Sequence, residues 1–149
     1  VLVGDGPLRE TLKEEARSLG VADRAFFIGT VLPDKMPSVY AGADLFLFTS
    51  LTDTQGLVLV EAKAAGLPAV AVGALGVNDM VEDGVDGYLC KNDPGELAEK
   101  ASSLLRDEKR LEEMSQNAKR NAQAFSREAC AERLLRCYES VIRKGSAAS

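Results

Sequence analysis

Two acidic residues, Asp53 and Glu61, have the types and spacing best suited to holding a ligand in this chain. Asp53 lies in the polar segment 49–55, and Glu61 lies in the apolar segment 56–65, whose pattern predicts a helix. A carboxylate among apolar residues requires hydroxyl or amide donors to offset its lost hydration. We therefore expect Glu61 to accept hydrogen bonds from such donors.

The start of this helix predicts a second feature of the same site. The backbone N–H groups near Gly56 and Leu57 have no acceptor inside the helix, and the helix dipole adds a partial positive charge there. Such an N-terminus binds phosphate groups. Gly56 has no side chain, so an oxygen can approach the backbone closely.

Each carboxylate also has a purely structural interpretation. Taken alone, Asp53 is more typical of a helix N-cap or an Asx turn than of a ligand contact. Glu61 alone is more often solvated, or paired with Lys63 or Lys91, than functional.

Composition excludes several other kinds of chemistry. The chain has no histidine, so a Ser-His or Cys-His nucleophile is excluded and a catalytic zinc site is not expected. Cys90, Cys130 and Cys137 lack metal-ligand spacing, and Cys130 and Cys137 share a helix face, which predicts two core residues in a protein of the reducing cytoplasm. The net charge is −5 without a basic stripe, which argues against nucleic-acid binding, and no apolar run is long enough to span a membrane.

Short apolar strands alternate with helices along one domain. We expect strands at 1–3, 25–28, 44–48, 68–72 and 87–90. Helices are expected at 7–19, 35–41, 56–65, 78–81 and 93–143, the last with breaks near Asp107 and Phe125. This order predicts an α/β fold, a doubly wound parallel sheet covered on both faces. Ligands bind such sheets at the carboxyl ends of the strands, which here are the loops 4–7, 29–34, 49–55 and 73–78.

Five segments together resemble the C-terminal domain of family 4 retaining glycosyltransferases of the GT-B fold. They are VLVGDGPLRETL (1–12), FFIGTV (26–31), YAGADLFLFTS (40–50), TDTQGLVLVEAKAAGLPAV (52–70) and VEDGVDGYLC (81–90). The resemblance implies that residues 1–144 form a Rossmann-like nucleotide-sugar-binding domain and that residues 145–149 form a disordered tail.

The resemblance also implies roles for single residues. The family's paired acidic motif falls on Asp53 and Glu61, so Asp53 would hold the transferred sugar and Glu61 the donor ribose. The backbone amides of Gly56, Leu57 and Val58 would hold the diphosphate or sugar hydroxyls, and the backbone of Val31 would read the base. The implied nucleotide-sugar-binding set is Gly4, Thr30, Val31, Gln55, Gly56, Leu57, Val58 and Glu61. Three positions depart from the pattern: Asp53 is shorter than the usual Glu, and Gln55 and Lys63 replace an aromatic residue and a methionine.

The implied activity is transfer of a hexose from a nucleoside diphosphate sugar to an acceptor with retention, in a front-face displacement that needs no metal or other cofactor. The TDTQGL wording is like that of relatives that glycosylate lipids, and a polysaccharide precursor is the other acceptor considered. A non-catalytic nucleotide-sugar-binding module and a nucleotide-sugar epimerase are the alternatives.

In this family the domain begins with one further strand and helix, which carry an Arg and a Lys that neutralise the diphosphate. We therefore expect the chain to be a piece that lacks them and lacks the N-terminal acceptor domain. The piece alone is then expected to be inactive, and an open slot beside Val1–Val3 could lead to self-association. Any membrane contact would lie in the absent half.

Overall fold

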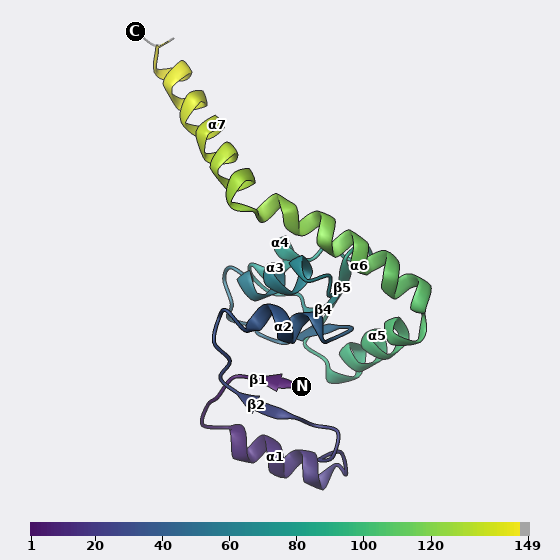
Figure 1. Cartoon of the computed structure of the whole chain (residues 1–149). Coiled ribbons are helices and arrows are strands. Elements are labelled where there is room, and N and C mark those ends of the chain that lie inside the picture. The colour runs from purple at the N-terminus through teal and green to yellow at the C-terminus, as the bar shows by residue number, and fades with distance from the viewer. Residues whose placement is uncertain (147–149) are drawn as a thin grey trace. The chain divides into compact units, whose positions relative to one another are not determined.

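The computed structural model describes residues 1–146. The chain divides into two compact units, Val1–Val39 and Tyr40–Ser149. Figure 1 labels the elements, and each unit is described below by itself.

The first unit is a strand-helix-strand motif. Strand β1 (Leu2–Val3) pairs in parallel with β2 (Phe27–Gly29), and helix α1 (Arg9–Ser18) connects them. The Arg9 guanidinium donates to the carbonyl of Phe27 at 3.0 Å and so ties α1 to β2. Gly20, at φ 67°, follows the helix as expected. The predicted start at Pro7 was wrong: Pro7 lies in a turn, and the helix begins at Arg9.

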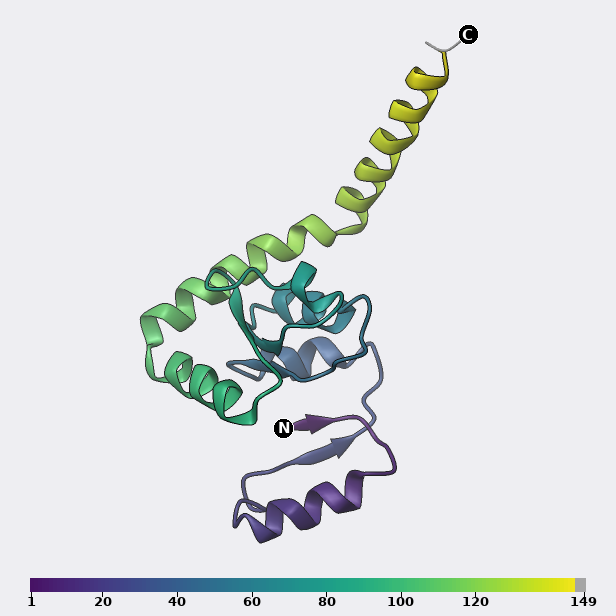
Figure 2. The ribbon, with the colours of Figure 1, turned by 180° about the vertical axis from the view of Figure 1, so that it is seen from behind.

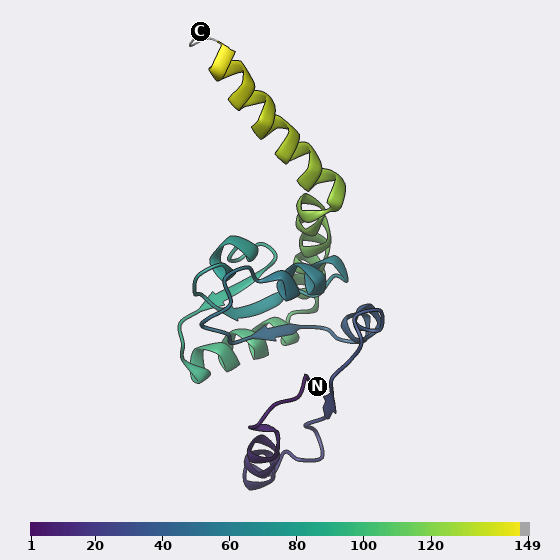
Figure 3. The same ribbon diagram turned by 90° about the vertical axis from the view of Figure 1, so that its left-hand side faces the viewer.

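The second unit is a three-layered α/β fold. Its strands β3 (Phe46–Phe48), β4 (Ala69–Val72) and β5 (Gly87–Cys90) form a parallel sheet in the order β3-β4-β5. The helices are α3 (Leu57–Ala64), α4 (Val77–Met80), α5 (Pro94–Arg106), α6 (Glu108–Ala122) and α7 (Arg127–Ser146), with the 3-10 turn η1 (Gln123–Phe125) before α7. Helix α2 (Met36–Ala41) spans the boundary between the units. Helices lie on both sides of the sheet, as Figures 2 and 3 show.

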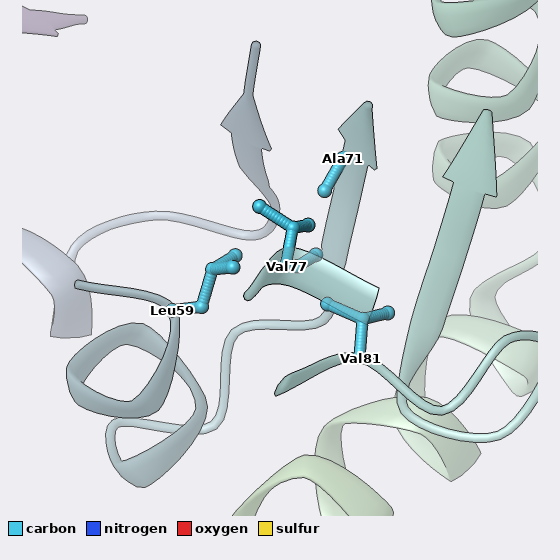
Figure 4. Packing of buried hydrophobic residues seen from close by; sticks show 5 residues of the cluster. Leu59, Ala71, Val77 and Val81 are labelled. Carbon is cyan, nitrogen blue, oxygen red and sulfur yellow. The ribbon is translucent and has the colours of Figure 1, made fainter. Parts of the chain in front are cut away.

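Alternate residues of the central strand β4 face two different cores, because successive side chains of a strand point to opposite faces. Ala69 and Ala71 pack with Leu59 of α3 and with Val77 and Val81 (Figure 4). On the other face, Val70 packs with residues of α5 and α6: Ala101, Leu104 and Met114. All four residues of β4 are buried. The two-sided core confirms the predicted doubly wound arrangement.

The strands of the described residues form one two-stranded and one three-stranded sheet. Whether a preceding segment supplies a further strand stays a prediction.

Helix α7 corrects two expectations. Cys130 and Cys137 were predicted to be core residues, but both are exposed, because the described residues do not cover their side of α7; of the three cysteines, Cys90 is buried. The helix also continues to Ser146, beyond the predicted boundary of the tail, and residues 147–149 lie outside the described part. Within residues 1–146, no helix has both the length and the apolar composition needed to cross a membrane.

Candidate functional site

Asp53 organises the polar turn that leads into α3. Its Oδ1 accepts hydrogen bonds from the backbone N–H groups of Gln55 at 2.9 Å and of Gly56 at 2.6 Å. These two donors hold the pKa of Asp53 below its ordinary value. The N–H of Asp53 itself donates to the Ser50 hydroxyl at 3.2 Å. The structure therefore shows Asp53 in an Asx turn, one of the two structural interpretations that the sequence left open; the N-cap of α3 is Gly56, which has no side-chain cap.

Gly56 is fixed by both its backbone conformation and its surroundings. Its φ is 60°, a left-handed value, and a Cβ at this position would lie 2.9 Å from Cγ of Met80. Its N–H group is bonded to Asp53. Of the three expected phosphate-binding amides, those of Leu57 and Val58 therefore offer donors in the first turn of α3, where N–H groups have no acceptor inside the helix.

Glu61 lies one turn further along α3 with its side chain exposed to solvent. Its Oε2 accepts a hydrogen bond from the Tyr40 hydroxyl at 3.1 Å. The hydroxyl donor expected for Glu61 is thus present, and it comes from Tyr40 of the chain itself. Tyr40 is buried, with 6% of its surface exposed. Burial, reinforced by the hydrogen bond to Glu61, raises the pKa of Tyr40 to about 12.

Tyr40 was not identified as a site residue from the sequence. It lies 21 residues from Glu61, and no local pattern marks two residues so far apart as partners. The alternative that Glu61 pairs with Lys63 was wrong. Lys63 Nζ contacts Asp86 Oδ2 at 2.5 Å and donates to the carbonyl of Met80 at 2.7 Å.

The loop after β4 packs directly against the turn of Asp53. A Cβ on Gly76 would lie 2.2 Å from the carbonyl oxygen of Thr54, so only glycine fits. The neighbouring Leu75 has φ 39°, a left-handed backbone conformation that is strained for a leucine. Two of the four loops predicted at the carboxyl ends of the strands are therefore brought together in the second unit.

The remaining predicted residues lie in the first unit. Gly4 follows β1 with φ 118° and donates its N–H to the carbonyl of Gly29 at 2.8 Å. This bond joins the loops that follow β1 and β2. Thr30 is exposed and Val31 is half-buried after β2. Gln55, in the second unit, is exposed beside Asp53. Among residues 1–146, no group of three or more His, Cys, Asp or Glu side chains is arranged to hold a metal ion.

Comparison with known proteins assigns this sequence to one family. The sequence profile of "Glycosyl transferases group 1" matches residues 1–121. The chain therefore belongs to the glycosyl transferases group 1 family.

Similar proteins come from several bacteria. The chain is 38% identical over 144 residues to the D-inositol 3-phosphate glycosyltransferase of Corynebacterium kroppenstedtii, which is 95% of this chain and 32% of that protein. It is 32% identical over 142 residues to the N-acetyl-alpha-D-glucosaminyl L-malate synthase of Bacillus anthracis, 95% of this chain and 36% of that protein. The chain thus spans about a third of the length of these curated relatives.

Among solved structures, the Anabaena protein Alr3699/HepE in complex with UDP-glucose is 30% identical and superposes with a TM-score of 0.82. The match covers 93% of this chain and 40% of that one. The predicted α/β fold of a GT-B C-terminal half is thereby confirmed.

Proposed function

We propose that this chain is the donor-binding part of a retaining glycosyltransferase that transfers a hexose from a nucleoside diphosphate sugar to an acceptor in the cytoplasm. One observation carries the proposal: the exposed carboxylate of Glu61 lies on the same helix as the amides of Leu57 and Val58, whose N–H groups have no acceptor inside the helix. Residues three or four apart lie on one helix face, one turn away from each other. This spacing is comparable with that between a phosphate and the ribose hydroxyls of one nucleotide.

In this proposal Glu61 accepts the ribose hydroxyls, and the N-terminus of α3 holds the diphosphate through backbone donors and the helix dipole. Asp53 orders the turn and presents Oδ2, which forms no hydrogen bond within the described residues, toward the transferred sugar. The chain then contributes positioning and stabilisation of the leaving diphosphate, and no metal or other cofactor takes part. Gln55, beside Asp53, belongs to the same proposed site. The roles of Gly4, Thr30 and Val31 in the first unit stay predictions from the sequence.

The solved structure of a similar protein suggests which donor nucleotide to test first. HepE was solved with UDP-glucose, so a uridine nucleotide is the first probe to use. Isothermal calorimetry of the full-length protein with UDP-, GDP- and ADP-sugars tests the base. Glu61→Ala should abolish or strongly weaken binding of the preferred donor. Glu99→Ala removes another exposed glutamate, on α5, and should leave binding unchanged. Equal affinity of both variants and the wild type would overturn the proposal.

Transfer itself requires an acceptor site, which we place in the part of the protein that precedes this chain, together with any membrane contact. The isolated 149-residue chain should therefore transfer sugar poorly or not at all. Robust transfer by the purified chain would contradict this assignment.

Membership of a glycosyltransferase family does not favour the module or epimerase alternatives. One observation keeps a test of the module worthwhile, because one oxygen of Asp53 is engaged by the backbone. In the full-length protein, Asp53→Glu discriminates: little change or a loss of transfer supports the enzyme, whereas a gain of activity would support a module whose Asp53 reflects lost chemistry. Product analysis with a labelled donor separates transfer from epimerisation.

A further inference from the structure

The hydrogen bond between Tyr40 and Glu61 joins a buried donor to an exposed acceptor. Tyr40 has 6% of its surface exposed, whereas Glu61 is open to solvent. The bond is 3.1 Å long and connects α2 with α3. Because the buried ring of Tyr40 cannot move into solvent, this hydrogen bond restrains the flexible side chain of Glu61.

The Tyr40 ring is itself held by aromatic residues of β3. It meets Phe46 edge-on, with ring centroids 5.9 Å apart and an interplanar angle of 79°. Phe46 stacks on Phe48 with centroids 6.0 Å apart. Such contacts fix the orientation of a ring. The position of the Tyr40 hydroxyl is therefore set by the sheet.

The bond also assigns different roles to the two oxygens of Glu61. Because the pKa of Tyr40 is raised to about 12, its hydroxyl stays protonated at neutral pH and donates. Oε2 accepts this hydrogen bond. Oε1 forms no hydrogen bond within the described residues and is available to a ligand.

We propose that Tyr40 is a positioning residue that orients Glu61 so that its free oxygen meets the ribose hydroxyls of the donor. This inference rests on the proposed function, since it needs a ribonucleotide at α3. Tyr40 itself touches no ligand in this arrangement. Its contribution to binding must therefore depend both on Glu61 and on the ribose hydroxyls.

The test is a comparison of two nucleotides on the full-length protein. Dissociation constants of UDP and of 2′,3′-dideoxy-UDP are measured for the wild type, Tyr40→Phe, Glu61→Ala and the double variant. Tyr88→Phe is the matched control, because Tyr88 lies on β5 and its hydroxyl interacts with Arg110. Comparing the two nucleotides within each variant makes the result independent of the fraction of protein that is folded.

The expected result is that Tyr40→Phe weakens UDP binding by about three- to tenfold, the effect of losing one ordinary hydrogen bond. It should leave binding of the dideoxy nucleotide unchanged and add nothing in the Glu61→Ala background. Tyr88→Phe should match the wild type with both nucleotides.

Two results would overturn the inference while the proposed function stands. One is wild-type affinity for UDP in Tyr40→Phe when Glu61→Ala binds weakly. The other is an equal loss for both nucleotides, which identifies a purely structural role for Tyr40. If the wild type binds no UDP, GDP or ADP, or if Glu61→Ala binds UDP as the wild type does, the proposed function itself is wrong.

Discussion

Replacing Lys63 by methionine should strongly destabilise the second unit, although methionine is common at this position in the family that the sequence resembles. The Lys63 and Asp86 side chains have 3% and 0% of their surfaces exposed, and their charged atoms lie 2.5 Å apart. Removing Lys63 leaves the Asp86 charge buried without its ion-pair partner, with only the hydrogen bonds from Glu82 N–H and Asn121 Nδ2, which costs about 3–5 kcal/mol. Lys63→Met should lower the free energy of unfolding by that amount, measured by urea denaturation.

Two further variants separate the buried charge from other effects of the substitution. Lys109→Met makes the same exchange at an exposed lysine of α6 and should change stability by less than about 0.5 kcal/mol. Adding Asp86→Asn to Lys63→Met removes the orphaned charge, and the asparagine can still accept from the Glu82 N–H that Asp86 binds at 2.9 Å. The double variant should regain most of the lost stability. If Lys63→Met is as stable as Lys109→Met, the buried ion pair does not exist in solution.

Three other predictions follow from the site. Because the N–H groups of Gly56 and Gln55 lower the pKa of Asp53 below 3.8, its carboxylate adds stability that is present above that pH and is lost as the pH falls through the folded pKa. Urea unfolding at several acidic pH values should show that Asp53→Asn loses this dependence, and an unchanged profile would contradict these hydrogen bonds. The absorbance of the phenolate form should show Tyr40 titrating near pH 12, and this titration should be absent in Tyr40→Phe. The stability that Tyr40 contributes is present below its ordinary pKa of 10 and is lost as the pH rises through 12. Gly76→Ala should lower the free energy of unfolding by about 1–3 kcal/mol and weaken UDP binding, because its Cβ would meet Thr54. Gly6→Ala is the control and should be neutral, since a Cβ there has no atom within 4 Å. Calorimetry that finds both variants alike would refute the close packing of these loops.

Much of the fold follows from local patterns. The alternation of short apolar strands with helical periodicity predicted all five strands within two residues of their observed ends. The predicted breaks near Asp107 and Phe125 coincide with the start of α6 and with η1. Such features are local because the period of apolar residues and the capping groups act within a few residues of sequence.

The candidate site was only partly predictable. The turn at Asp53 and the helix start at Leu57 are local, so the sequence indicated both the loop and the two carboxylates. The sequence also offered an Asx turn as one interpretation of Asp53, and the structure shows this turn. It could not show that this turn uses the Gly56 amide, which removes one donor from the expected phosphate site.

Side-chain partners distant in sequence were decided only by tertiary structure. Glu61 accepts a hydrogen bond from Tyr40 because α2 and α3 both contact β3. Lys63 forms an ion pair with Asp86 because the chain after α4 returns to α3. Cys130, on an apolar helix face, is exposed because the described residues do not cover that face. Periodicity specifies which side of a helix is apolar, but the packing of whole elements determines which residues that side contacts.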